Sequence, residues 1–155
     1  MAVYNTTTAA ALTGTIIGTR VDRASATLPA TTQTPYFHVY GGRCAVTMLL
    51  GEVTTVVQTQ ANNASWESNP TTGTTNAMCA TLDITAAEAG TLLSITGTVG
   101  DAMIKGSSGA VKGTLAPIIV AVGDLEFKCS ATNTGATKWS LWYIPLDDGA
   151  YIAAV

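Results

Sequence analysis

Residues 125–146 read LEFKCSATNTGATKWSLWYIPL, two runs of alternating apolar and polar residues on either side of the turn-forming segment Asn133-Thr134-Gly135. A period of two is typical of a strand with one buried face, so both runs are predicted to be strands. A three-residue loop with Gly135 in the left-handed conformation would join them as a hairpin. The expected register pairs Cys129 with Trp139, Phe127 with Leu141 and Leu125 with Tyr143. A loop one residue shorter or longer would set apolar side chains opposite polar ones, which a sheet with one buried face resists.

The second run is also apolar on its other face, at Trp142, Ile144 and Leu146. A strand with two apolar faces is expected to be covered on both sides, by another part of the chain or by a neighbouring subunit. We therefore take Trp142, Ile144 and Leu146 as candidates for a subunit interface.

The 155 residues are enough for one domain with a substantial core. Only 11% of the residues are charged, against roughly 25% in an ordinary globular domain. Weak charge combined with a positive mean hydropathy would limit the solubility of a free monomer. We expect partners to cover much of the surface, as in a component of an assembly.

The net charge is −3, and the seven basic residues are scattered, so they predict no concentrated basic face for nucleic acid. No run approaches the roughly 18 apolar residues of a membrane span, and the N-terminus lacks the basic and apolar regions of a signal peptide. We expect a soluble protein, made without a secretory signal, that binds neither nucleic acid nor membrane.

Residues 1–15 are small, polar and low in complexity, so this segment buries little by itself. It is predicted to be a flexible N-terminal arm, either a loose tail or an extended segment laid on a neighbouring subunit. Tyr4 and Leu12 are the side chains that could anchor it. Residues 16–155 are expected to form a single β-sandwich domain.

Strand-like runs recur through this domain at the spacing of about 8 to 12 residues that is typical of sandwiches and barrels. They cover residues 16–21, 36–40, 44–50, 53–59, 78–84, 91–96, 99–105, 115–122 and 150–155, with a short run at Trp66. Residues 22–35 are predicted to be a loop. Gly51-Glu52 predicts either a hairpin or a bent strand across a bulge, and Thr85 to Gly90 fits one helical turn. The sequence therefore predicts an all-β antiparallel β-sandwich, for which a jelly roll is one candidate topology, with at most one short helical turn.

Few residues are suited to catalysis or metal binding. His38 is the only histidine, and no Gly-x-Ser-x-Gly motif accompanies it, so it is interpreted as a surface or interface residue rather than a triad member. One histidine and three dispersed cysteines give no recognisable zinc set, and Cys44, Cys79 and Cys129 are predicted to be buried free thiols. Asp147-Asp148-Gly149 could offer oxygen ligands to calcium, but the pattern favours a turn. We expect a protein that is not an enzyme and has no cofactor or metal.

Residues 138–150, KWSLWYIPLDDGA, and residues 82–92, LDITAAEAGTL, resemble small virion proteins of tailed bacteriophages, the kind made beside the major capsid protein. The resemblance covers about the C-terminal half and includes no catalytic motif. It implies a capsid decoration, or cement, protein that is made in the host cytoplasm. Such a protein binds the outer surface of the assembled virion capsid as a homotrimer, with the major capsid protein as its partner, and stabilises the shell.

The alternative is a phage tail or fibre module that recognises a host-surface carbohydrate, with Trp66 or Trp142 in its site. Trp139 is better explained as a core residue. Large aromatic side chains outside a core occur both in sugar-stacking platforms and in protein interfaces, so Trp142 fits either function.

Overall fold

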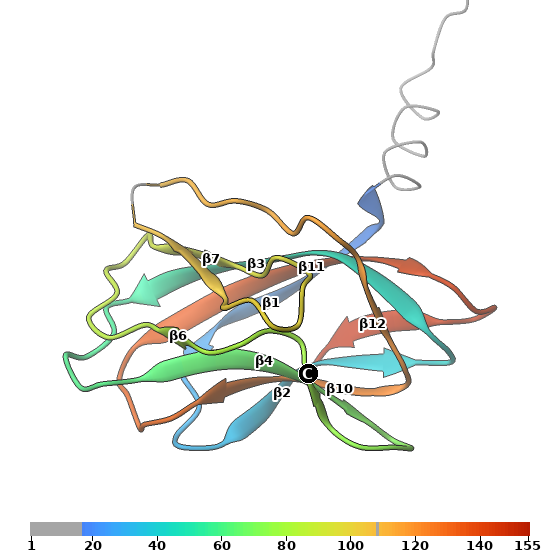
Figure 1. Ribbon diagram of the computed structural model, residues 1–155, viewed down its shortest axis with the longest axis horizontal. Coiled ribbons are helices and arrows are strands. Elements are labelled where there is room, and N and C mark those ends of the chain that lie inside the picture. The colour runs from blue at the N-terminus through green and yellow to red at the C-terminus, as the bar shows by residue number, and fades with distance from the viewer. Residues whose placement is uncertain (1–16, 108) are drawn as a thin grey trace, which may run out of the picture.

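The computed structural model describes residues 17–107 and 109–155, which form two antiparallel β-sheets packed face to face (Figure 1). Sheet A contains β1 (Thr19–Thr27), β3 (Cys44–Thr55), β7 (Leu92–Ser94), β8 (Ile104–Gly106), β9 (Ile118–Val120) and β11 (Ala136–Pro145). Sheet B contains β2 (Gln33–Tyr40), β4 (Asn63–Pro70), β5 (Asn76–Ala77), β6 (Leu82–Asp83), β10 (Gly123–Cys129) and β12 (Tyr151–Ala154). Alternating side chains fill the space between the sheets, as the period-two runs predict. The prediction of an all-β sandwich is confirmed.

The strands are connected as in a jelly roll. Along sheet A the order is β1-β11-β3-β7-β8, and along sheet B it is β12-β2-β10-β4-β5, with β9 also paired to β3 and β6 to β4. The pairs β1–β11, β2–β10, β3–β7 and β4–β5 are therefore nested, and successive pairs alternate between the two sheets. This nesting is the double Greek-key arrangement of a jelly roll. One consequence is that β1, near the start of the chain, lies beside β11, near its end.

The predicted hairpin across Asn133-Thr134-Gly135 is wrong, because β10 belongs to sheet B and β11 to sheet A. The chain crosses from one sheet to the other at this corner, so side chains expected on the same face of one sheet face each other across the core. Phe127 and Trp139 show this, with ring centroids 5.1 Å apart. The alternation correctly identified which face of each strand is buried, but a buried face can belong to either sheet of a sandwich.

Gly135 is needed for close packing rather than for a left-handed turn. Its φ is not positive, but a Cβ atom there would lie 2.9 Å from the Cα of Val57 and 3.2 Å from a methyl group of Leu28. The side chain of Asn133 orders the corner, because its Oδ1 accepts hydrogen bonds from the N–H groups of Gln58 (2.9 Å) and Gly135 (3.0 Å).

Aromatic side chains from both sheets make the centre of the core. The ring centroid of Trp66 lies 4.8 Å from that of Trp139 and 5.3 Å from that of Phe127, and all three side chains are at most 1% exposed. Gly51 makes room for this cluster, since a Cβ atom there would lie 2.7 Å from the Trp139 ring. Strand β3 continues through Gly51, which pairs with Trp139 in regular register, so the hairpin alternative is wrong. The shifts in its register against β11 lie on either side, between Ala136 and Thr137 and between Trp142 and Tyr143.

Several local predictions differ from the structure: the runs predicted at 78–84, 99–105 and 115–122 overlap only with the short strands β6, β8 and β9, and the short run at Trp66 is the eight-residue strand β4. Strand β1 continues to Thr27, where a loop was expected from Asp22, because its pairing with β11 extends past a bulge between Arg23 and Ala26. Residues 85–90 form turns instead of a helical turn, since Ala86 has a φ of 53°, a left-handed conformation that interrupts a right-handed helix. The prediction for the three cysteines is confirmed, because all are free and buried.

Candidate functional site

The outer surface of sheet A carries an apolar centre that the sandwich itself leaves partly exposed. Cross-strand pairing of Trp142 with Arg20 and Met48, and of Ser140 with Asp22 and Leu50, places these side chains on the face opposite the core. We call this surface the Trp142 face. Its apolar members are Met48, Leu50, Leu92, Trp142 and Ile144, all of intermediate burial, and its polar members are Arg20, Asp22, Glu52, Lys138 and Ser140.

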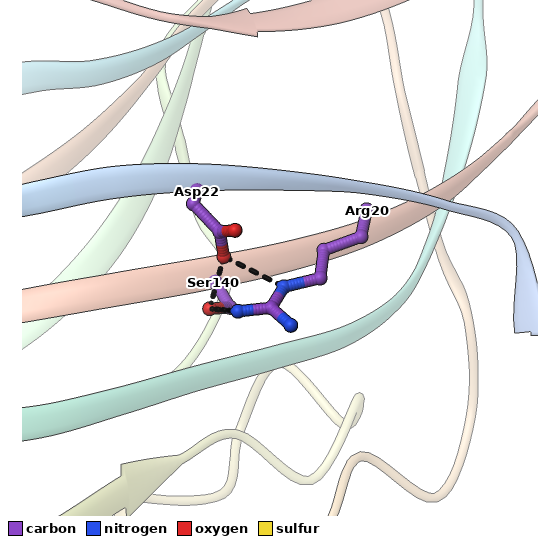
Figure 2. Close-up of polar contacts among 3 residues, drawn as sticks. All are labelled: Arg20, Asp22 and Ser140. Atoms are coloured by element: carbon purple, nitrogen blue, oxygen red, sulfur yellow. Dashed lines mark hydrogen bonds and ion pairs between the residues drawn. The ribbon is translucent and has the colours of Figure 1, made fainter.

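Hydrogen bonds within β1 and between β1 and β11 hold three of the polar side chains of this face, Arg20, Asp22 and Ser140 (Figure 2). Arg20 Nε donates to Asp22 Oδ1 at 2.7 Å, and the Ser140 hydroxyl donates to the same oxygen. The Ser140 hydrogen bond, followed by Arg20, lowers the pKa of Asp22 from its ordinary value. The Arg20 guanidinium carbon also lies 5.4 Å from the centroid of the Trp142 ring, within cation–π distance.

Two adjoining hollows flank this network. One, of about 250 Å³, is lined by residues that include Trp142, Leu50 and Glu52, and the other, of about 400 Å³, by residues that include Asp22 and Arg23. Arg20, Lys138 and Ser140 line both hollows. Lys138 Nζ pairs with Glu52 Oε2 at 2.9 Å, so the basic and acidic groups are balanced. The arrangement offers one aromatic surface with fixed donors and acceptors, which can orient a bound partner or ligand.

The sequence-based interface candidates fall into three places. Trp142 and Ile144 lie on the Trp142 face. Leu146 follows the end of β11 and is 47% exposed, with its N–H bonded to the Arg43 carbonyl. Tyr4 and Leu12 lie outside the described residues. A subunit contact at these positions stays a prediction.

The polar half of the Trp142 face was not predicted from the sequence. Lys138 and Ser140 alternate with Trp142 along one strand, which was visible, but Arg20 and Asp22 were divided between a predicted strand and a predicted loop. The signal that could have found them is the same alternation, continued along β1.

Trp66 cannot belong to a sugar-binding platform, because it is 0% exposed at the centre of the core. Trp139, at 1% exposed, is a core residue as predicted. Of the two tryptophans proposed for carbohydrate binding, only Trp142 is accessible.

His38 lies on the outer surface of sheet B and is paired with an acid. Its Nδ1 is 2.6 Å from Asp124 Oδ1, and its ring lies 4.3 Å from that of Tyr40, which in turn stacks on Tyr151 at 4.8 Å. This aromatic row was not anticipated, although His38 and Tyr40 alternate with buried residues in the sequence. The prediction of a surface histidine is confirmed.

Asp147 acts in a turn, as the sequence favoured. Its carboxylate accepts hydrogen bonds from the backbone N–H of Arg43 (2.7 Å) and from the Arg43 guanidinium (2.6 and 2.9 Å), and these bonds lower its pKa well below the ordinary value. Within residues 17–107 and 109–155, no three His, Cys, Asp or Glu side chains are grouped as a metal site requires.

Comparisons with known proteins add no functional assignment. Among the described residues, no helix has the length and apolar character to cross a bilayer. No protein family, curated protein or solved structure matches the chain.

Proposed function

We propose that the chain is a non-enzymatic structural protein of a tailed-bacteriophage virion, a decoration protein that binds the outer surface of the assembled capsid as a homotrimer. The observation that carries the proposal is the Trp142 face, where a half-buried tryptophan lies among apolar side chains and beside the ion pairs Arg20–Asp22 and Lys138–Glu52. Aromatic residues, Met and Arg are enriched in protein interfaces, and this face combines all three kinds at Trp142, Met48 and Arg20.

Two further features support an assembly role. Only 11% of the residues are charged, which leaves much surface that a partner could cover without desolvating charges. The jelly roll is also common in viral capsid domains, although lectin domains and cupins share it, so the fold supports the proposal by analogy alone.

The mechanism is stabilisation by binding. A protein that binds the assembled lattice but not the separated capsid subunits lowers the free energy of the assembled state, because rupture must first release the bound protein. In this proposal the Trp142 face lies between copies within the trimer, and the trimer binds across joints between major capsid proteins.

Imaging of particles with and without the protein tests its location. We expect density on the capsid surface that disappears when the protein is omitted. Density confined to the tail would reject a decoration role.

The copy-to-copy contact is tested by the molar mass of the purified protein, measured by light scattering. Trp142→Ser should lower the mass from a trimer to a monomer, because a central interface tryptophan contributes about 2 kcal/mol or more to binding, roughly 30-fold in affinity. Val56→Ser is the matched control, since Val56 is 47% exposed and lies outside the Trp142 face. A monomeric wild type, or an unchanged mass for Trp142→Ser, would contradict the contact.

The second candidate function is recognition of a host-surface carbohydrate by a tail or fibre module. The specific observation in its favour is the pair of hollows beside Trp142, where Arg20 and Asp22 present a donor and an acceptor next to an aromatic ring. Titration with host-surface glycans should then change the Trp142 fluorescence, and Trp142→Ser should abolish glycan binding with the trimer unaffected.

A further inference from the structure

A second apolar surface lies at the open side of the sandwich, beside β9. It is a groove of about 390 Å³ between β9 in sheet A and the β4–β5 region of sheet B, and we call it the edge groove. Its apolar lining comes from Pro70, Met78, Val99, Ile118, Ile119 and Val120. Met78 and Val120, each 2% exposed, reach it from the core, while Val99 (54%) and Ile119 (66%) are open to solvent. Among the residues that the structure describes, no charged side chain lines this groove, unlike the two hollows of the Trp142 face.

The strand that borders the groove carries no charged side chain. Charges are one of the features by which edge strands avoid pairing with another chain. Edge strand β1 carries Arg20, Asp22 and Arg23, and edge strand β8 carries Lys105. Strand β9 is Ile-Ile-Val, and within the described part of the chain it pairs only with β3. Its free edge and the groove beside it therefore suit an added strand.

The N-terminal segment has the matching composition. Residues 1–16 contain no Asp, Glu, Lys or Arg, and they include Val3, Tyr4, Leu12 and Ile16. An uncharged segment can enter an uncharged groove without the cost of desolvating a charge. At full extension, 16 residues reach about 50 Å.

The segment leaves the sandwich at the border of the Trp142 face. The Thr47 hydroxyl lies within hydrogen-bond distance of the carbonyl oxygens of Ile17 and Trp142, which fixes the point of departure. Across sheet A from this point, Thr19 of β1 pairs with Tyr143 of β11, Tyr143 with Val46 of β3, and Val46 with Ile118 of β9. Strand β9 therefore lies three strand spacings from β1, roughly 14 Å, at the opposite edge of the same sheet. Each copy would thus provide the N-terminal segment at one edge of sheet A and the groove that receives it at the other. A contact of this kind is head-to-tail, and it closes into a ring when the rotation between copies allows it.

We propose that residues 1–16 of one copy extend as a strand along β9 and into the edge groove of the neighbouring copy, with Tyr4 and Leu12 seated against its apolar lining. The proposal rests on the oligomeric state in the proposed function and is independent of capsid binding. It identifies the edge groove as a binding site for the N-terminal segment, separate from the Trp142 face.

Two changes in the full-length chain test this binding site. The double variant Val99→Ser/Ile119→Ser replaces exposed side chains, so it should fold normally, yet it should reduce the molar mass in solution. The control is Val56→Ser/Val155→Ser, which alters two valines of similar exposure, 47% and 63%, outside the groove and should keep the wild-type mass. An unchanged mass for the groove variant would overturn the proposal.

A direct binding measurement separates this contact from the Trp142 face. Deletion of residues 1–16 leaves the buried cluster from Leu28 to Ile152 complete, so residues 17–155 should fold, which urea unfolding verifies. A fluorescent peptide of residues 1–16 should bind this shortened protein, and Val99→Ser/Ile119→Ser should weaken binding at least tenfold. Equal binding to both proteins, or none to either, would refute this binding site. Peptide binding without capsid binding would reject the decoration role and keep this inference.

Discussion

Replacement of Asn133 by alanine tests the corner between β10 and β11, where the chain changes sheets. Asn133 is 4% exposed, and its Oδ1 accepts two backbone N–H groups, of Gly135 in a buried bond and of Gln58 in a partly buried one. Alanine would leave both donors without this acceptor. If the segment were a hairpin loop instead, Asn133 would be an exposed turn residue with little effect on stability.

The expected cost can be worked out from these contacts. A buried N–H without a partner costs about 1–3 kcal/mol, and a partly buried one about 0.5–1.5 kcal/mol because water can reach it. Within the described part of the chain the Asn133 Nδ2 is buried and has no hydrogen-bond partner, so removing it reduces the loss in the free energy of unfolding by about 1 kcal/mol. The balance is a loss of about 2 kcal/mol in the free energy of unfolding.

Urea unfolding followed by fluorescence measures this loss. With a slope of about 2 kcal/mol per molar urea, the midpoint should fall by about 1 M. Thr134→Ala, at the exposed neighbouring residue, is the control and should change the free energy by less than about 0.5 kcal/mol. Equal effects of the two substitutions would refute the assigned role of Asn133.

Three further predictions concern the core, the thiols and a turn. Gly51→Ala should cost about 1–3 kcal/mol in urea unfolding, because its Cβ would lie 2.7 Å from the buried Trp139 ring; a neutral effect would show that the ring can move. Burial raises the pKa of the Cys129 thiol to about 11, so Cys129 should resist a thiol reagent at pH 8 until the protein unfolds, and rapid native labelling would contradict this. The hydrogen bonds from Arg43 lower the pKa of Asp147, so their stabilisation is present above the ordinary carboxyl pKa of about 3.9 and is lost as the pH falls below it. The difference in urea midpoint between wild type and Asp147→Asn should therefore shrink from pH 7 to pH 2.5, and a constant difference would contradict the pairing.

The fold class was predictable because burial leaves a period of two in the sequence. Phe127 and Trp139 were both placed correctly on buried faces, and Trp142 on the opposite one. Sheet membership was not predictable in the same way, since the loop sequence fits a hairpin while the corner depends on contacts with Val57 and Leu28, distant in the chain. The choice at Gly51 between a hairpin and a continuing strand was open for a similar reason, because the glycine provides space for the ring of Trp139, which is distant in the chain.

The candidate site was predictable only where one strand contributes to it. Trp142 and Ile144 follow from the alternation along β11 alone. Arg20 and Asp22 come from β1, and their partner Ser140 is 120 and 118 residues away in the sequence. No local pattern can report a contact over that separation. The ion pair Arg20–Asp22 beside Trp142 is visible only once the topology places β1 next to β11.

That separation also determines when the Trp142 face can form. The jelly roll places β1 beside β11, so Arg20 and Asp22 meet Ser140 only after almost the whole chain is present. The same strand β11 supplies Trp139 to the core, so the outer face cannot be complete while the core is incomplete. A partly folded chain therefore lacks the surface that we assign to contacts between copies. Under the proposed function, association through the Trp142 face would be restricted to molecules whose two sheets have already closed, which would favour assembly of finished subunits over aggregation of unfinished ones.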